Sequence, residues 1–240
     1  MLAVVKRIRQ RQPRLGARKL HYVLNTVESV RIGRDRLFNV LREHRLLITP
    51  TRSYRKTTFS HHRFRRHPNL LKAGPEQVTA TGPEQVWVAD ITYLPTQEQP
   101  TYLSLVTDAY SRKIVGHSVH ADLTTESVVG ALRNALAQRQ SRQRLVHHSD
   151  RGIQYCSVAY QEMHRQHGIT CSMTDGYDCY QNALAERVNG ILKAELLVQR
   201  PANLAQARRM VKESIAIYNN ERPHSALKNK TPDAVHRGFS

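Results

Sequence analysis

Three acidic residues stand at positions where a carboxylate needs a chemical reason. Asp90 interrupts the apolar stretch "VWVADITYLP", Asp150 follows "RLVHHS", and Glu186 lies in "YQNALAERVNGILKAELL". Unit charges of one sign ~4 Å apart repel by about 4 kcal/mol at an effective dielectric of about 20, so a cluster of the three stays ionised only with cations among it. Mg²⁺ prefers oxygen ligands and keeps positions open for phosphate oxygens and water. Three converging acids could therefore hold two Mg²⁺ ions and support displacement at phosphorus.

The polar row that contains Glu186 has two explanations. Asn182, Glu186, Asn189 and Lys193 follow one another at spacings of four, three and four residues, which places them on one face of a helix over residues 180–197. The apolar residues fall on the opposite face. A catalytic helix has this pattern, and so has an ordinary surface helix. The row gains meaning only in combination with the other two acids.

The elements that must position the acids follow from residue 85 onward. Strand-like sequence covers residues 85–95, 101–111 and 113–121, with short turns between these segments. A helix over 124–140, a strand over 144–149, a helix over 157–168 and a strand over 169–174 come next. This order predicts an α/β fold, a mixed sheet of five strands with helices packed on it. Asp90 then lies inside the first strand and Asp150 at the end of the fourth.

The distribution of charge divides the chain. The formal net charge is +18, and residues 1–85 hold 19 of the 37 Lys and Arg residues but only five of the 19 acids. Such a balance favours a polyanionic partner, because each phosphate neutralised by Lys or Arg releases condensed counterions. We expect three parts, over residues 1–49, 50–84 and 85–240. Double-stranded DNA is the leading partner.

The first part contains two short amphipathic stretches, "ARKLHYVLNTVES" and "IGRDRLFNVLREHRLLI". Two such helices suit a helix-turn-helix, in which Arg34 and Arg36 on the second helix would contact DNA, but they also suit simple packing elements. The basic stretch after them is expected to be an extended linker. It is either a solvated tether or an arm in which Arg63, Arg65 and Arg66 follow phosphates.

Several other residues are assigned structural roles. Asp108 is expected to support a turn or pair with Arg112, and Trp87 to lie in the core. His147 and His148 are expected to act structurally or behind the ligands of the site. The basic segment "ERPHSALKNKTP", residues 221–232, either braces the core or touches DNA, and we favour bracing. The three cysteines have no CxxC spacing and are interpreted as reduced thiols.

No apolar run approaches the ~20 residues of a membrane span, and the N-terminal sequence lacks the apolar stretch and cleavage site of a signal peptide. We therefore expect a cytosolic protein with no membrane partner; the family resemblance described below implies the bacterial cytosol and association with the nucleoid when the protein is bound to DNA.

Five motifs together resemble one family. "VWVADITYLP", "DAYSRKIVG", "HHSDRGIQY", "NALAERVNGILKAEL" and "YNNERPHSAL" followed by "TP" are similar, in this order over residues 86–233, to second-frame (OrfB-type) transposases of the insertion sequence three family. The 35 residues between Asp150 and Glu186 are also typical of the wider superfamily of transposases and retroviral integrases. The resemblance implies a ribonuclease H-like core over residues 85–240, with a C-terminal helix and tail. A helix-turn-helix-like DNA-binding segment over 1–49 and a basic linker over 50–84 would precede it.

The resemblance also implies roles for individual residues. Asp90 would bridge two Mg²⁺ ions, for which Mn²⁺ can substitute, while Asp150 would bind one ion and Glu186 the other. Asn189 and Lys193 would face the DNA end. The chain departs from the common family wording at Gln181, where many members have aspartate. This change leaves the three expected metal ligands intact and puts a role for that position in doubt.

The implied reaction is cleavage of a strand at the terminal inverted repeats of an insertion sequence, followed by attack of the freed 3′-hydroxyl on a second phosphodiester, such as target DNA. Two ends must be held together, so a homo-oligomer of at least two copies on DNA is expected. An upstream-frame protein or frameshift fusion is a further expected partner. The alternatives are a catalytically silent DNA-binding accessory or regulatory protein and a stand-alone nuclease of the same fold.

Overall fold

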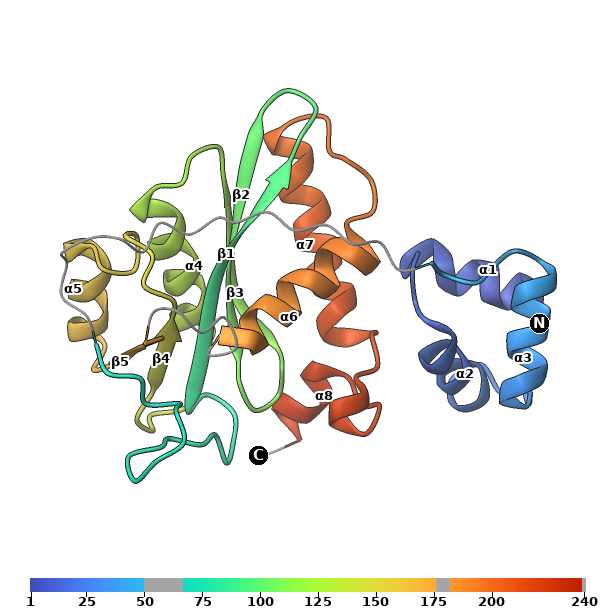
Figure 1. The fold of residues 1–240 in the computed structure, drawn as a ribbon, viewed down its shortest axis with the longest axis horizontal. Coiled ribbons are helices and arrows are strands. Elements are labelled where there is room, and N and C mark those ends of the chain that lie inside the picture. Colours follow the sequence, from blue (N-terminus) through green and yellow to red (C-terminus); the bar gives the residue numbers. More distant parts are fainter. Residues whose placement is uncertain (50–66, 176–181, 239–240) are drawn as a thin grey trace.

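The computed structural model describes residues 1–49, 67–175 and 182–238. Three short helices form a small helical unit, and the rest of the described chain builds a five-stranded sheet with helices on both faces (Figure 1). The helical unit lies beyond α6 and α7, on the side of the molecule away from α5 (Figure 1). The expected α/β architecture with a preceding all-α segment is confirmed.

The sheet is mixed and has the strand order β3-β2-β1-β4-β5. Its strands are β1 (Val86–Pro95), β2 (Pro100–Asp108), β3 (Ile114–His120), β4 (Val146–Ser149) and β5 (Thr170–Met173). β1, β2 and β3 form an antiparallel meander, whereas β4 and β5 run parallel to β1 and to each other. All five strands lie within a residue or a few of the segments in which strand-like composition predicted them. The central strand β1 is the one that carries Asp90.

The two faces of the sheet support separate apolar clusters. On one face, α4 (Thr125–Gln138) and α5 (Val158–Gln166) cover a cluster that contains Trp87, Ala89 and Ile91 of β1. On the other face, α6 (Ala183–Ile191) and α7 (Leu204–Asn220) cover a cluster that contains Leu94 of the same strand. Successive side chains of a strand point to opposite faces, so Asp90 points toward the α6 side.

The chain after β5 forms the second helical layer and its closing elements. α6 continues without a break into a π-helix, η2 (Leu192–Leu196). The helix predicted over 180–197 is therefore a continuous helix from residue 183 to residue 196 that changes from α to π geometry, and residues 180 and 181 lie outside the described residues. After α7 come a short 3-10 helix, η3 (Ser225–Leu227), and the final helix α8 (Pro232–Arg237). The Thr231 side chain caps α8 by accepting a hydrogen bond from the Ala234 backbone N–H.

The helical unit has its own small core. α1 (Leu2–Arg11), α2 (Ala17–Thr26) and α3 (Arg34–Glu43) bury Val5, Ile8, Leu20, Leu24, Leu37 and Leu41 against one another. The second and third helices match the two predicted amphipathic stretches. The first helix, α1, was not predicted. It has many basic residues and buries only Val5 and Ile8, so its apolar face is narrow.

Glu195 of η2 joins the helical unit to the core. Its backbone carbonyl accepts a hydrogen bond from the Arg14 N–H (3.3 Å), and its carboxylate pairs with Lys19 (3.4 Å). The same carboxylate accepts two hydrogen bonds of 2.8 Å from Arg222, a guanidinium that is almost completely buried. Arg222 lies in the 221–232 segment, so this segment braces the core as expected.

Part of the expected linker packs on the core. Leu70 donates its N–H to the Ser172 hydroxyl (2.9 Å), and Pro68 accepts from the Met173 N–H (3.2 Å), so the chain runs beside β5. Glu84 is buried, and its carboxylate accepts a hydrogen bond from the Ser141 backbone N–H. Residues of the expected linker therefore make contacts with the sheet and its loops within the described range 67–84. Residues 50–66 lie outside the described residues.

The other edge of the sheet is covered by side chains. Asn219 of α7 bonds both the N–H (3.0 Å) and the carbonyl (2.9 Å) of Ile114 in β3. Arg208 donates to the Val119 carbonyl (3.1 Å), and Asn134 of α4 donates to the His117 carbonyl (3.0 Å). Several polar backbone groups on both edges of the sheet are therefore bonded within the chain.

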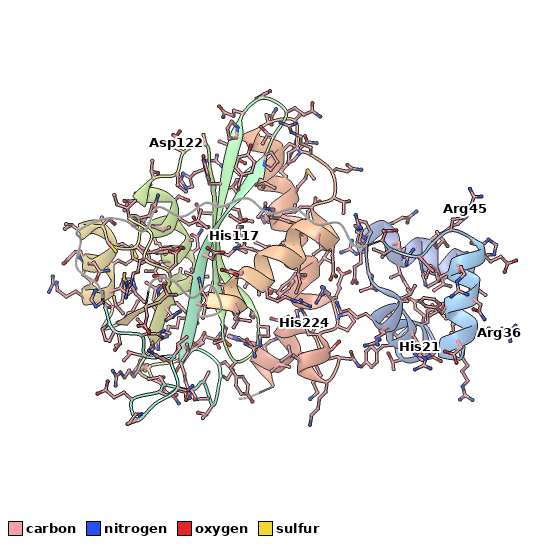
Figure 2. The ribbon with its side chains drawn as sticks, in the orientation of Figure 1. His21, Arg36, Arg45, His117, Asp122 and His224 are labelled. Carbon is pink, nitrogen blue, oxygen red and sulfur yellow. The ribbon has the colours of Figure 1, made fainter. Side chains whose placement is uncertain are left out.

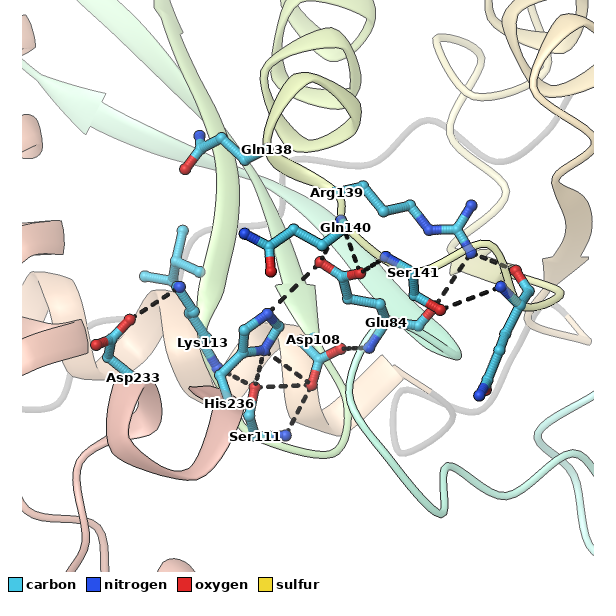
Figure 3. Close-up of polar contacts among 12 residues, drawn as sticks. Glu84, Asp108, Ser111, Lys113, Gln138, Arg139, Gln140, Ser141, Asp233 and His236 are labelled. Carbon is cyan, nitrogen blue, oxygen red and sulfur yellow. Dashed lines mark hydrogen bonds and ion pairs between the residues drawn. The ribbon is translucent and has the colours of Figure 1, made fainter. Parts of the chain in front are cut away.

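A buried polar network connects α8 to the turn after β2 (Figure 3). Asp108 has no exposed surface and accepts hydrogen bonds from the backbone N–H groups of Glu84 (2.6 Å) and Ser111 (2.7 Å). The Ser111 hydroxyl also bonds His236 of α8 (2.9 Å), and Lys113 pairs with Asp233 (2.9 Å). The prediction that Asp108 supports a turn is confirmed.

Among the helices of the described chain, none has the length and hydropathy to cross a membrane.

Candidate functional site

Asp90 and Asp150 lie close together where two adjacent parallel strands run side by side. β1 and β4 pair from Val86 with Val146 through Val88 with His148. Each acid follows the last pair by two residues, Asp90 within β1 and Asp150 directly after β4. Side chains two residues apart along a strand share a face, so the Asp90 carboxylate points to the α6 side, and the Asp150 carboxylate is near enough to raise the pKa of Asp90. The fold thus brings together two acids with 59 residues between them in the sequence.

The Asp90 carboxyl group is surrounded by protein atoms, although part of its surface stays open. Burial is the largest cause that raises its pKa to about 7, and the neighbouring Asp150 carboxylate adds to this rise. Hydrogen bonds from the Asn189 side chain (2.8 Å) and the Ile91 N–H (2.9 Å) act in the opposite direction. Asp90 therefore resists ionisation until a positive charge arrives.

Asp150 is held at the start of the loop after β4. Its Oδ1 accepts a 2.9 Å hydrogen bond from the Gly152 N–H, which folds the carboxylate over its own turn. A side chain at Gly152 would place its Cβ 3.0 Å from the same oxygen, so a larger residue there would push the Asp150 carboxylate aside by a few tenths of an ångström. The loop fixes the orientation of Asp150 next to Asp90.

The polar row of α6 faces the sheet. Asn182 donates to the Ala89 carbonyl (3.0 Å), Asn189 to the Asp90 carboxylate (2.8 Å), and Lys193 to the Thr92 hydroxyl (3.2 Å). Asn182 and Asn189 are buried, so the interpretation as an ordinary surface helix is wrong for this row. Three side chains from successive turns of the helix contact three nearby positions of β1. This arrangement fixes α6 across the central strand.

Glu186 lies in the first turn of α6, between Asn182 and Asn189 in the same row. It is exposed, and burial of part of its surface together with the Asp150 carboxylate raises its pKa. Glu186 also raises the pKa of Asp90, so all three acids interact electrostatically. An open hollow of about 470 Å³ begins at Glu186 and runs along α6 past Arg187 and Gly190 to Glu195. The third acid therefore borders a space that is open to a large ligand.

The chemistry of the donor set fits hard divalent cations. The side chains that gather here offer carboxylate and amide oxygens, and the Oδ1 atoms of Asn182 and Asn189 are buried without a hydrogen-bond partner in the described structure. Within the described ranges, no group of three or more His, Cys, Asp or Glu side chains forms a single metal-binding cluster.

The remaining predicted contacts lie apart from the acids. Arg34 and Arg36 are exposed on α3, and Figure 2 shows Arg36 on the outer side of the helical unit, far from the sheet. Arg63, Arg65 and Arg66 lie outside the described residues. His147 bonds the Tyr160 hydroxyl (3.2 Å) and His148 bonds the Ser172 hydroxyl (2.8 Å), so both histidines have structural roles. Asp122, at the periphery in Figure 2, precedes α4 in the sequence.

Sequence reasoning missed two residues of the site. Asn182 was placed in the polar row without a function, and the structure shows it anchoring α6 to the residue directly before Asp90. Tyr155, in "HHSDRGIQY", was not singled out. Its ring is buried and the carboxylates of Asp150 and Asp90 affect its pKa. The position of Tyr155 five residues after Asp150 was the available signal.

Comparisons with known proteins agree with this geometry. Two models described as an integrase core domain match residues 80–179 and 167–232. The chain is 39% identical over 237 residues to the insertion element IS600 uncharacterized 31 kDa protein of Shigella sonnei, covering 98% of this chain and 85% of that protein. It is 35% identical over 157 residues to transposase InsF for insertion sequence IS3A of Escherichia coli (strain K12), covering 65% of this chain and 54% of that protein. The chain thus spans about half the length of the second relative.

Among solved structures, the HTLV-2 integrase catalytic core domain in complex with magnesium, in its trimeric form, has a similar fold. The TM-score is 0.53 at 20% sequence identity, and the match covers 66% of this chain and 99% of that one. At this identity the likeness concerns the fold, the ribonuclease H-like arrangement of sheet and helices described above.

Proposed function

Because the chain belongs to the insertion sequence three family of transposases with an integrase core, we propose that it cleaves and joins DNA strands at the ends of an insertion sequence. The reaction would be a polynucleotidyl transfer that depends on Mg²⁺, with water and then a 3′-hydroxyl as the attacking group. The observation that carries this proposal is the register of β1 and β4. Asp90 and Asp150 each follow the last pair of this register by two residues, and the pKa of Asp90 responds to both Asp150 and Glu186, which supports the proposal that the three acids act together.

The three acids would divide two cations among them. Asp90, in the middle, would bridge both ions, while Asp150 would hold one and Glu186 the other. The raised pKa values of Asp90 and Glu186 support this role, because the cause of both includes repulsion that a cation relieves. When bound, Mg²⁺ would stabilise charge on the phosphate oxygens and lower the pKa of the attacking hydroxyl group.

The other side chains would prepare the site for this chemistry. Asn189 keeps the Asp90 carboxylate in one orientation through a 2.8 Å hydrogen bond, and Gly152 does the same for Asp150 through its N–H. Lys193 bonds Thr92 in the structure and carries a positive charge next to the acids. This lysine and Asn189 would meet the phosphates of the DNA end. Fixed donors reduce the reorganisation needed during the reaction.

The DNA partner would include the terminal inverted repeats and target DNA. The net charge of +18 and the exposed Arg34 and Arg36 of α3 support binding to phosphates. α3 is the second helix of the pair expected to form a helix-turn-helix. Two DNA ends must meet for joining, so we expect at least two copies of the chain in the active complex. An upstream-frame protein or a frameshift fusion would be a further partner.

An excision assay tests the proposal. A plasmid carries the chain's own locus with several hundred flanking bases, and joined ends are detected with outward-facing primers. We expect junction DNA with the wild type and none with Asp90→Asn, Asp150→Asn or Glu186→Gln. Glu213→Gln, an exposed acid on α7, is the matched control and should behave like the wild type.

The outcomes separate the candidate functions. Junctions that persist in all three acid variants would contradict the proposal. If the wild type gives none, even with the upstream frame supplied, the catalytically silent DNA-binding role becomes the better assignment. Purified wild-type protein that hydrolyses DNA but never joins it would indicate a nuclease.

A further inference from the structure

Tyr155 is a buried tyrosine whose hydroxyl group has no hydrogen-bond partner in the part of the chain that the structure describes. Only 2% of its surface is exposed. Leaving a buried donor unpaired costs about 1–3 kcal/mol, so native proteins rarely keep such a group without a use. The remaining polar atoms of the residue are bonded. Its N–H donates to the Gly152 carbonyl (3.0 Å), and its carbonyl accepts from Gln161 (2.8 Å).

The ring of Tyr155 is fixed in one position. It packs edge-on against Tyr160, with ring centroids 5.4 Å apart, in the apolar cluster beneath α4 and α5. Its Cδ2 lies 3.5 Å from the point where a Gly152 side chain would begin, next to the loop that holds Asp150. Tyr155 therefore lies in the cluster on the α4 and α5 face of the sheet, close to the loop of Asp150 and within electrostatic reach of the Asp150 and Asp90 carboxylates.

The charged groups that act on this hydroxyl are the two strand carboxylates. Burial is the main cause that raises the pKa of Tyr155, the Tyr160 ring adds to it, and the Asp150 and Asp90 carboxylates come next. A phenol with such a pKa stays protonated and acts as a hydrogen-bond donor. A carboxylate oxygen can accept its hydrogen bond. When one oxygen of a carboxylate contacts a cation, the second oxygen still has lone pairs for this bond.

We propose that Tyr155 is a positioning residue of this site, whose hydroxyl donates a hydrogen bond to the Asp150 carboxylate when the acids bind divalent cations. This inference rests on the proposed function, because it needs cations between the acids. It assigns Tyr155 the task that supporting residues perform at metal sites, which is to fix the orientation of a ligand from behind. Loss of such a partner typically weakens metal affinity by about 10–100-fold.

The chain offers a matched pair of variants for the test. Tyr155→Phe removes the unpaired hydroxyl, and Tyr160→Phe removes the neighbouring hydroxyl, which already bonds His147 at 3.2 Å. The measurement is thermal unfolding of the full chain as a function of Mg²⁺ concentration, with Asp150→Asn as the variant expected not to respond. The quantity compared is the Mg²⁺ concentration that gives half of the maximal stabilisation.

We expect Tyr155→Phe to unfold at or above the wild-type temperature without Mg²⁺, and to need about tenfold more Mg²⁺ for half-maximal stabilisation. Tyr160→Phe should unfold at a lower temperature with an unchanged Mg²⁺ requirement. Equal Mg²⁺ requirements for Tyr155→Phe and the wild type, with Asp150→Asn unresponsive, would overturn this inference and leave the proposed function standing. If Mg²⁺ stabilises the wild type and Asp150→Asn equally, Asp150 does not bind the metal. That result would contradict the proposed metal site and, with it, this inference.

Discussion

The side-chain amide of Asn189 donates a 2.8 Å hydrogen bond to the Asp90 carboxylate and so links α6 to the central strand. Asn189 is buried, and its other polar atom, Oδ1, has no partner in the described structure. Of all the bonds between α6 and β1, this one touches an acid directly. It therefore couples the position of the helix that carries Glu186 to the orientation of Asp90.

Replacing Asn189 by alanine should reduce strand cleavage and joining by about 10–100-fold, the usual cost of losing a partner of a metal ligand. The Asp90 carboxylate would lose a donor that favours its ionised form. The measurement is the rate of junction formation, with the folded state checked by thermal unfolding. Asn220→Ala is the control, because Asn220 is exposed on α7 and bonds only the Ala216 carbonyl. Equal losses in both variants would refute the role of Asn189.

The pKa of Asp90 predicts a pH dependence of stability without divalent cations. Its value of about 7 in the folded state lies above the ordinary value of 3.8, so the folded protein binds more protons than the unfolded one between these two values. Stability should therefore fall as pH rises from about 4 to about 7, by at most ~4 kcal/mol, and by less to the extent that solvent reaches the carboxyl group.

Unfolding of the wild type and Asp90→Asn should be compared at pH 5 and pH 7.5, because the difference between them isolates this group. Burial lowers the pKa of His164 to about 4 and that of His224 to about 3, and these histidines act in the opposite sense in both proteins. We expect the stability advantage of Asp90→Asn to grow with pH and to shrink when Mg²⁺ is added. An advantage independent of pH would contradict the assignment.

Two glycines give opposite predictions for the same substitution. A Cβ at Gly116 in β3 would lie 2.2 Å from the Ala131 carbonyl oxygen, where α4 crosses the sheet, so Gly116→Ala should destabilise the fold by about 1–3 kcal/mol or more. A Cβ at Gly190 meets no described atom within 4 Å, and Gly190→Ala within α6 should stabilise by about 0.5–1 kcal/mol. Urea unfolding measures both. Similar effects of the two substitutions would show that α4 does not approach β3 this closely.

The exposed arginines of α3 predict a change in the salt dependence of DNA binding. If Arg34 and Arg36 each contact one phosphate, the slope of log K against log salt concentration should decrease by about one for each substitution by alanine. Arg133→Ala, on the exposed surface of α4, should leave the slope unchanged. The slope is measured by titrating labelled duplex DNA at four or more salt concentrations. Slopes equal to the wild type in both α3 variants would exclude this surface.

The sequence predicted the strands from their strand-like composition, as around Asp90, and most helices from the helical spacing of their apolar residues. It also placed Asp90, Asp150 and Glu186 on the right kinds of element. It did not predict that residues 67–84 pack on the core, because the bonds of Leu70 and Glu84 are made to groups far away in the chain. Asn182 and Asn189 likewise point inward because α6 packs across β1. The periodicity of residues within the helix does not show which face packs against the sheet.

The covering of both sheet edges limits how copies of this chain can associate. β5 is flanked by residues 68–70, and β3 is bonded by Asn219, Arg208 and Asn134. An uncovered edge would serve as a template for strand addition by a second molecule. Here the bonds named above occupy part of each edge, which disfavours strand addition by a second copy at those positions. We therefore expect contacts between copies on two DNA ends to use other surfaces of the chain.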